Sequence, residues 1–280
     1  MSKGSPSPAR VAVRKTYKLF IGGKFPRSES GRSYLVADTN VALASRKDVR
    51  DAVLAARAAV KGWSGATAYN RGQILYRVAE MLEGRRDQFV GLGVPADEVD
   101  AAIDRWVWYA GWSDKLAQVY GGANPVAGPY FNLSAPEPSG VVGVVAPAEP
   151  SLLGLVSVIA PAIVAGNTVV VLVGESAPLP AVTLAEVLAT SDLPGGVVNL
   201  LTGRPAETAP WLAGHMDVNA LDLAGAVDPD LAADLEIRAA ENLKRVLRPV
   251  PAGHDWYADP GITRMTALLE TKTVWHPKGQ

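Results

Sequence analysis

The amino-acid sequence predicts an α/β fold in which helices cover both faces of a doubly wound parallel sheet. The prediction rests on residues 140–179, where two β-branched runs, Val141–Val145 and Thr168–Val173, enclose an apolar helix expected over Leu152–Ala165. Strand, helix and strand in this order form a βαβ unit, whose parallel strands require a crossover connection. Both runs are continuously apolar rather than alternating, which is typical of strands buried on both faces.

The same alternation continues along the chain after residue 179. Helices are expected over Pro180–Thr190, Ala206–Ala213 and Pro229–Leu247, and strands over Val197–Leu201 and Val218–Leu223. Pro180 and Pro229 lie at helix starts, where the missing N–H costs nothing. Four strands that alternate with helices favour one doubly wound sheet.

The part of the chain before residue 140 is predicted to form a hairpin followed by helices. In YKLFIGGKF, the pair Gly22-Gly23 supplies the positive φ angles that a tight hairpin requires. Ser45 and Asp48 have the spacing of a capping box, which marks a helix start. Apolar spacing predicts three helices, over residues 45–62, 70–89 and 97–119.

Two segments stand outside this pattern. Tyr130–Leu133, beside Pro136 and Pro138, forms either a second hairpin with Val141–Val145 or an exposed ribbon. Residues 263–278 end in TKTVWHPKG, a lone strand-like run that no helix follows.

Composition narrows the classes of function. A chain of 280 residues can form one large domain or two small ones. Its formal net charge of -1 gives no indication of nucleic acid or an anionic membrane as a partner. The absence of cysteine excludes disulfides, thiolate metal sites and a cysteine nucleophile.

Residues 1–16 are polar and rich in Pro and Ser, which predicts a disordered tail rather than a signal peptide, and hence a cytoplasmic protein.

A membrane helix is the competing interpretation of the most apolar stretch. Leu152–Val173 carries no charged residue and is long enough to span a bilayer. Pro161 within the run, Asn167 after Gly166, and a β-branched second half favour the soluble βαβ unit instead.

Motifs for chemistry are scarce. The sequence contains no G-x-G-x-x-G, no P-loop and no G-x-S-x-G. His215, His254 and His276 are isolated from one another, which predicts neither a metal site nor a catalytic base. Glu149 is better placed, because it follows the end of a predicted strand, where ligands bind in such sheets. The aromatic residues around Trp106 are interpreted as a packing face. The residues alone therefore predict a nucleotide-type fold without a visible catalytic set.

Several segments together resemble the aldehyde dehydrogenase superfamily. They include YKLFIGGKF, PSGVVGVVAP, APAIVAGNTVVVL and LPGGVVNLLTG, in the order found in that family, and the resemblance covers residues 17–248. It implies a Rossmann-like cofactor domain over 17–248, followed by a linker and an oligomerisation-type strand over 249–280. The segments WVWYAGWSDKL and TKTVWHPKG are similar, more narrowly, to the non-catalytic second half of two-domain family-16 aldehyde dehydrogenases.

The catalytic residues that the resemblance implies are missing. The family's nucleophile is a cysteine, and this chain has none. Its general base is the glutamate of a Glu-Leu-Gly-Gly stretch, where this sequence continues from Leu247 with Arg248-Pro249-Val250. The oxyanion asparagine is matched by Glu149, whose carboxylate would repel the developing charge. The resemblance thus implies no catalytic residue here, and the roughly thirty residues after Pro249 leave no room for the family's catalytic domain.

Cofactor binding is implied only in part. The positions that match the family's NAD- or NADP-binding residues and keep a suitable side chain or glycine are Pro147, Glu175, Gly203 and Gly225. The lysine that contacts the ribose is matched by Leu172, and a glycine of the phosphate loop is matched by Asp230, whose charge would repel a pyrophosphate. Binding of NAD or NADP is therefore expected to be weakened.

The leading hypothesis is a truncated, catalytically inactive aldehyde dehydrogenase homologue that serves as a structural or regulatory partner. We expect its C-terminal strand, over Thr271–Trp275, to add to the sheet of another chain, in a hetero-oligomer with a full-length aldehyde dehydrogenase or in a homodimer. One alternative is a module that senses NAD(P) or another nucleotide. A second is an NAD(P)-dependent oxidoreductase that is active only with a partner chain. Neither nucleic acid nor a membrane is expected as a partner.

Overall fold

The computed structural model describes residue 11 and residues 13–279, and it confirms the predicted α/β fold. The predicted tail lies largely outside the described residues. The helices are α1 (Arg46–Ser64), α2 (Ala68–Glu83), α3 (Arg86–Gly91), α4 (Ala96–Trp112), α5 (Leu116–Tyr120), α6 (Leu153–Val164), α7 (Pro178–Ala189), α8 (Pro205–Ala213), α9 (Pro229–Ala240) and α10 (Thr263–Thr266). The strands are β1 (Ser33–Val36), β2 (Thr39–Ala42), β3 (Gly122–Asn124), β4 (Tyr130–Pro138), β5 (Val141–Val145), β6 (Thr168–Val173), β7 (Val198–Thr202), β8 (Ala220–Asp222), β9 (Arg245–Leu247) and β10 (Leu269–Pro277).

The central sheet has five parallel strands in the order β7-β6-β5-β8-β9. The chain moves outward from β5 through α6, β6 and α7 to β7, and then returns through α8 to β8 on the other side of β5. The winding direction therefore reverses between β5 and β8. In sheets of this type, ligands bind at the carboxyl ends of the strands beside such a switch point.

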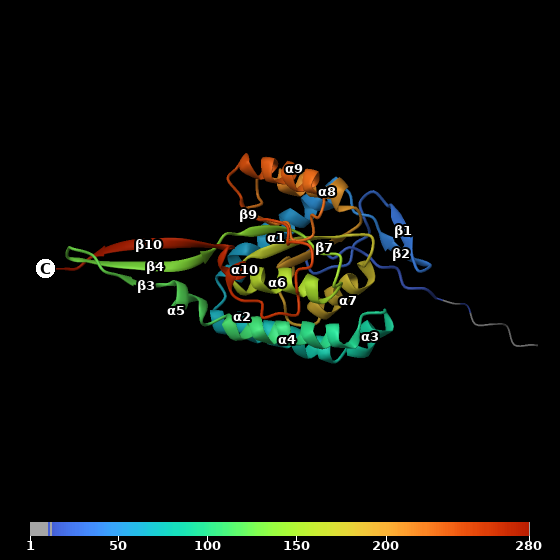
Figure 1. Cartoon of the computed structure of the whole chain (residues 1–280), viewed down its shortest axis with the longest axis horizontal. Helices are drawn as coiled ribbons and strands as arrows, with labels where there is room; N and C mark the ends of the chain where they lie inside the picture. The colour runs from blue at the N-terminus through green and yellow to red at the C-terminus, as the bar shows by residue number, and fades with distance from the viewer. Residues whose placement is uncertain (1–10, 12, 280) are drawn as a thin grey trace, which may run out of the picture.

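Helices cover both faces of this sheet (Figure 1). Helices α1, α8 and α9 lie on one face, and α6 and α7 lie on the other, with α2 and α4 packed outside them. The side chains of β6 alternate between the two hydrophobic cores, because successive residues of a strand point to opposite faces. Val169 and Val171 belong to the core under α6, whereas Val170 and Leu172 belong to the core under α1.

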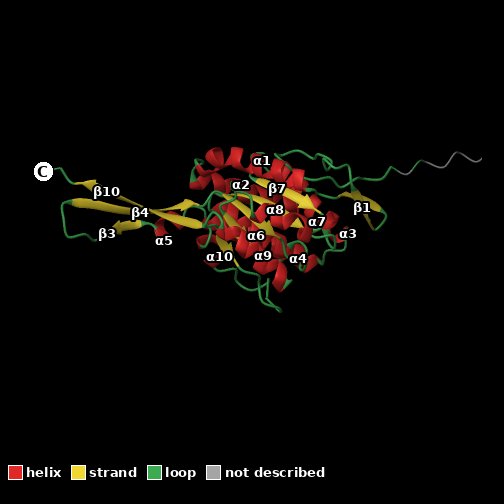
Figure 2. Ribbon diagram, turned by 90° about the horizontal axis from the view of Figure 1, so that it is seen from above, coloured by secondary structure: helices red, strands yellow, loops and turns green. Residues whose placement is uncertain are grey.

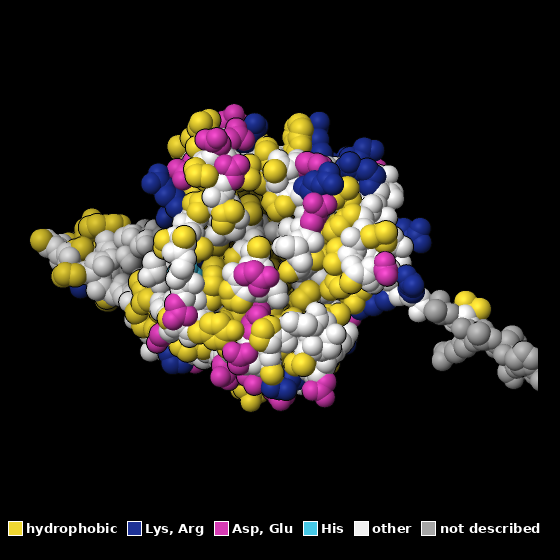
Figure 3. Space-filling view, turned by 45° about the vertical axis from the view of Figure 1, so that its right-hand side comes forward, with side chains coloured by type: hydrophobic (Ala, Val, Ile, Leu, Met, Phe, Trp, Pro, Cys, Tyr) yellow, Lys and Arg dark blue, Asp and Glu magenta, His cyan; other side chains and the backbone are white. Residues whose placement is uncertain are grey.

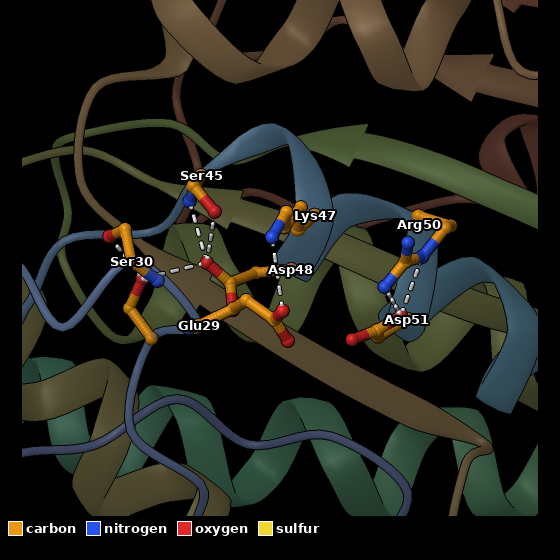
Figure 4. A network of polar contacts seen from close by, with 8 residues as sticks. Glu29, Ser30, Ser45, Lys47, Asp48, Arg50 and Asp51 are labelled. Carbon is orange, nitrogen blue, oxygen red and sulfur yellow. Dashed lines mark hydrogen bonds and ion pairs between the residues drawn. The ribbon is translucent and has the colours of Figure 1, made fainter.

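The N-terminal hairpin and the first helix start are confirmed. Gly22 and Gly23 have φ angles of 61° and 78°, and the Phe20 N–H donates to the Leu200 carbonyl at 2.9 Å, which attaches the hairpin to β7. Asp48, in the first turn of α1, accepts the Ser45 N–H at 2.7 Å in the predicted capping box. Figure 4 shows this carboxylate at the centre of a polar network with the 28–30 loop, where it also accepts the Glu29 N–H at 2.9 Å.

The predicted helices differ from the observed ones at their C-terminal ends. The helices expected over 70–89 and 97–119 each divide in two, after Glu83 and after Trp112. The last helix ends at Ala240 rather than Leu247, because Leu243 has a φ of 56° and residues 245–247 form β9. The Leu223 N–H donates to the Leu247 carbonyl at 2.9 Å, so pairing with β8 overrides the local helical pattern.

Trp106 of α4 is fully buried, as the packing interpretation predicted. The apolar stretch 152–173 divides into α6 and β6, and among the described residues no helix is both long and apolar enough to cross a membrane.

A three-stranded ribbon, β10-β4-β3, projects from the globular body (Figures 1 and 2). The open choice for residues 130–133 is thereby decided in favour of an exposed ribbon, since Val141–Val145 belongs to the central sheet. The expectation of a lone C-terminal strand was wrong: β10 pairs with β4 along its whole length, from Leu269 opposite Pro138 to Pro277 opposite Tyr130. This partner was missed because the two prolines in β4 read as a turn.

Candidate functional site

The carboxyl ends of β5 and β8 flank a cavity of about 610 Å³ at the switch point of the sheet. Pro147 and Glu149 follow β5 on one side of it, and Gly225 follows β8 on the other. The segment 249–256 closes the remaining side. The structure therefore brings Pro147 and Gly225, two of the residues predicted to bind a cofactor, to one strand edge, and the chain itself covers that edge, which the sequence did not indicate.

Gly225 is required by a close approach between the two loops. Its N–H donates to the Val145 carbonyl at 2.9 Å, and a Cβ at this position would lie 2.0 Å from the Ala146 carbonyl oxygen. Pro147 packs in turn on Gly154, where a Cβ would lie 2.8 Å from its Cγ. Gly225 thus holds the β5 and β8 loops together, and Pro147 packs the β5 loop against α6.

The N-terminus of α6 is occupied by a carboxylate of the chain itself. Glu98 of α4 is buried, and its Oε1 accepts the N–H groups of Leu152 and Leu153 at 2.6 and 3.2 Å. A helix N-terminus is the natural place to stabilise an anion. Here those donors are taken by Glu98, while Glu149 adds a second carboxylate at the cavity. The site therefore disfavours a developing oxyanion.

The N-terminus of α9, where the family resemblance places the pyrophosphate, is also self-capped. Asp228 accepts the Asp230 N–H at 3.0 Å through its Oδ1. Two carboxylates in one helical turn oppose a dinucleotide pyrophosphate, and the cap removes one of the N–H groups that would bind it. The residues present at this helix do not fit that part of NAD or NADP.

The two remaining predicted residues lie at the same sheet edge but outside the cavity lining. Glu175 follows β6, and the Arg204 Nε donates to its two carboxylate oxygens at 3.1 and 3.2 Å. Gly203 follows β7 with a φ of 142°, and a Cβ there would lie 2.9 Å from a methyl carbon of Leu43. The structure thus brings Pro147 and Gly225 together and leaves Glu175 and Gly203 apart from them.

Two polar contacts beside the site were missed from the sequence. Arg105 of α4 donates to the carbonyls of Trp256 and Ala258 at 2.7 and 3.1 Å, and this holds the covering segment down. Asp222, at the end of β8, is fully buried and forms an ion pair with Arg264. Asp222 could have been singled out from the sequence, because it is a charged residue inside an otherwise apolar strand. Arg105 had no comparable signal, because its partners are backbone carbonyls 150 residues away.

Among the described residues, no group of three or more His, Asp or Glu side chains is arranged to hold a metal ion.

The comparisons with known proteins identify the family. The model of the "Aldehyde dehydrogenase family" matches residues 38–249. This chain belongs to the aldehyde dehydrogenase family. Among curated aldehyde dehydrogenase relatives, "Aldehyde dehydrogenase, cytosolic 1" of Elephantulus edwardii is 32% identical over 262 residues, which cover 86% of this chain and 51% of that protein. Human "Retinal dehydrogenase 2" is 32% identical over 261 residues, covering 86% and 50%. The chain thus spans about half the length of the curated relatives it matches.

Solved aldehyde dehydrogenase structures share the fold. An NAD+ complex of aldehyde dehydrogenase from Bacillus cereus superposes with a TM-score of 0.77 at 26% identity, covering 83% of this chain and 50% of that one. The protein HpcC from Thermus thermophilus has a TM-score of 0.76 at 30% identity, covering 83% and 47%. The fold that contains the parallel five-stranded sheet is therefore shared with these two solved structures.

Proposed function

We propose that this aldehyde dehydrogenase family chain is a structural or regulatory partner of a full-length aldehyde dehydrogenase and does not itself oxidise aldehydes. The lack of any cysteine supports the second half of the proposal, since a thiolate nucleophile cannot form. The carboxylates of Glu98 and Glu149 beside the switch-point cavity support it further, because they oppose an oxyanion. The exposed strand β10 of the ribbon supports the role as a partner of another chain.

The backbone pattern of β10 determines which of its groups face outward. The Ser139 N–H donates to the Leu268 carbonyl at 3.2 Å, and the Lys278 N–H donates to the Pro129 carbonyl at 2.7 Å. In an antiparallel pair, the groups that face the partner strand belong to every second residue. Even-numbered residues of β10 therefore face β4, and odd-numbered residues face away from it. The outward N–H groups are those of Leu269, Thr271, Thr273 and Trp275.

The opposite edge of the ribbon offers little backbone for further pairing, because its outermost strand, β3, has only three residues. Even-numbered residues of β4 face away from β10, and β3 covers only Asn132 and Ser134 among them. The next two such positions are Pro136 and Pro138, which have no N–H to donate. Proline is a common means of blocking an exposed strand edge. The ribbon thus has one edge that is blocked and one, along β10, that is open to a strand from another chain.

Exposed apolar side chains accompany this open edge. Phe131 and Leu133 are 56% and 45% exposed on one face of the ribbon, and Trp275 is 57% exposed on the other. Hydrophobic side chains are visible over the projecting ribbon in Figure 3. A partner strand added to β10 would extend the sheet and cover part of this apolar surface. We propose that the partner is a full-length aldehyde dehydrogenase, as the similarity to two-domain family-16 proteins suggests, with residues 17–248 as the cofactor-type domain and 249–280 as linker and assembly strand.

The test is a proline at an outward position of β10. Thr271→Pro removes an outward N–H but none of the groups that pair with β4, and Thr271→Val is the matched control. We expect the native protein and the valine variant to co-purify with an aldehyde dehydrogenase identified by mass spectrometry, and the proline variant to lose it. A native protein that purifies as a monomer, or a proline variant with unchanged assembly, would contradict the proposal. A second copy of this chain as the only partner would favour the homodimer.

A second candidate function is NAD(P) binding without turnover, in a sensing module. The 610 Å³ cavity at the switch point favours it, as does the NAD+ complex among the similar structures. The carboxylates at α9 oppose it, so we expect calorimetry to detect no binding at millimolar NAD or NADP. Saturable binding would support the sensing module instead.

Aldehyde-dependent NADH formation by the purified complex, and not by the chain alone, would favour an oxidoreductase that needs its partner.

A further inference from the structure

A second cavity, of about 380 Å³, lies beneath the covering segment and beside the switch-point cavity. Its floor is made by three buried polar residues, Arg105 and Tyr109 of α4 and Ser157 of α6. Leu247 and Trp256 contribute apolar walls. No residue predicted to bind a cofactor lines it, so this polar cavity is distinct from the candidate site described above.

Tyr109 supplies a hydroxyl donor at the floor of the cavity. The side chain is only 1% exposed, and within the described part of the chain its hydroxyl makes no hydrogen bond. The hydroxyl lies among charged groups of Arg105, Arg264 and Asp259, which act on its ionisation. Burial is the largest influence and raises the pKa of Tyr109 to about 12, so the phenol stays protonated near neutral pH.

Two guanidinium groups supply further donors and a positive charge. Arg105 uses three of its five N–H groups on Ser157 and the two backbone carbonyls, and two remain. Arg264 pairs with Asp222 through one nitrogen. The buried Asp222, which lies outside the lining and pairs with Arg264, offsets one of the two positive charges of Arg105 and Arg264.

The rim restricts the size and charge of an occupant. Asp255 and Asp259 are exposed at the rim, where they accept the backbone N–H groups of Tyr257 and Gly261 at 2.9 and 2.8 Å. Arg248, also at the rim, pairs with Glu236 at 3.0 Å. Two carboxylates at the entrance would repel a doubly charged anion such as a phosphate. The apolar walls suit a short aliphatic group.

We propose that this cavity binds a small monocarboxylate, whose oxygens accept hydrogen bonds from the Tyr109 hydroxyl and from the guanidinium groups of Arg105 and Arg264. The acid's short aliphatic part would lie against Leu247 and Trp256. Such a ligand gives the phenol hydroxyl an acceptor and places its negative charge beside the guanidinium groups of Arg105 and Arg264. The inference does not depend on the proposed partner role, since it concerns a different part of the molecule.

The test compares propionate with propionamide, which has nearly the same shape but no charge. Nuclear magnetic resonance of the full chain, at constant ionic strength, would follow the indole N–H of Trp256. We expect saturable shifts with propionate and none with propionamide. Tyr109→Phe, which removes only the hydroxyl, should weaken propionate binding about tenfold, as expected for one hydrogen bond to a charged acceptor. Tyr120→Phe, on the exposed helix α5, is the control and should bind as the native protein does.

Three results would overturn the proposal. The first is the absence of saturable shifts with propionate in a folded native chain. The second is equal binding of propionamide, which would indicate an apolar cavity only. The third is a folded Tyr109→Phe variant that binds propionate unchanged. As a further check, Asp255→Asn should strengthen binding, because it removes a repulsive charge from the rim.

Discussion

The Arg105 Nη2 lies 2.7 Å from the carbonyl oxygen of Trp256, and this contact ties helix α4 to the segment that covers the carboxyl edge of the sheet. The same nitrogen reaches the Ala258 carbonyl at 3.1 Å, while Nη1 reaches the Ser157 hydroxyl. Burial lowers the pKa of the Arg105 guanidinium, but arginine remains charged in proteins. The buried Arg105 side chain therefore holds the covering segment, which borders both cavities, in place.

Replacing Arg105 should destabilise the chain. Arg105→Met leaves two carbonyls and one hydroxyl without their donor, and we expect a loss of about 3 kcal/mol in the free energy of unfolding, measured with urea. Arg77→Met is the matched control, because Arg77 is exposed and pairs only with Glu80 at 3.1 Å. Its effect should stay below about 1 kcal/mol. Equal effects of the two substitutions would contradict the role assigned to Arg105.

The Asp222–Arg264 pair should show strong coupling. Asp222→Leu leaves the half-buried Arg264 charge without its partner, and Arg264→Met leaves a fully buried carboxylate, so each should cost about 3–5 kcal/mol. The double variant should lose much less than the sum of the two, since neither charge then remains. A double-mutant cycle from urea denaturation measures this difference. Additive losses would show that the two side chains act independently.

Gly225→Ala should destabilise the fold, because the new Cβ would lie 2.0 Å from the Ala146 carbonyl oxygen and backbone atoms cannot easily move away. We expect a loss of about 2 kcal/mol or more. Gly62→Ala, at an open position inside α1, is the control of opposite sign and should stabilise the protein by about 0.5–1 kcal/mol. Thermal unfolding of both variants checks the prediction, and a neutral Gly225→Ala would refute the close approach.

Alkaline pH should weaken the fold through Tyr109. Its pKa is raised from 10.0 to about 12 in the folded chain, so the folded state keeps a proton that the unfolded state loses. The stabilising contribution is complete below pH 10 and declines as the pH rises toward 12, by up to about 2.7 kcal/mol. Stability measured at several pH values in this range should fall less in Tyr109→Phe than in Tyr120→Phe. Identical pH profiles would argue against a buried phenol.

Local sequence patterns predicted the elements whose own residues form a turn, a helix cap or a β-branched run. Gly22-Gly23 marked the hairpin, Ser45 and Asp48 marked the start of α1, and the β-branched runs marked β5 and β6. The resemblance to aldehyde dehydrogenases singled out Pro147 and Gly225, and the structure brings both to the lining of the switch-point cavity. The predictions of the hairpin, the start of α1 and the two strands were confirmed, because backbone preference and burial agree at their residues.

Elements that depend on distant partners were not predictable in the same way. Residues 245–247 follow a helical pattern, yet they pair with β8 once Leu243 adopts a positive φ. Strand β10 was expected to lie alone, because its partner β4 contains Pro136 and Pro138. Those prolines are tolerated since their missing N–H groups face away from β10.

The sequence by itself determined the α/β class, the family and the position of the switch-point loops, since alternating apolar runs and loop glycines are local features. Only the tertiary structure decided that the covering segment 249–256 lies over the strand ends, that Glu98 and Asp228 occupy the two helix N-termini, and that Tyr109 lines a polar cavity. These relationships join residues whose side chains meet only after the sheet has formed. Their cause is the burial of charged and polar groups, which must find partners wherever the packed chain brings them.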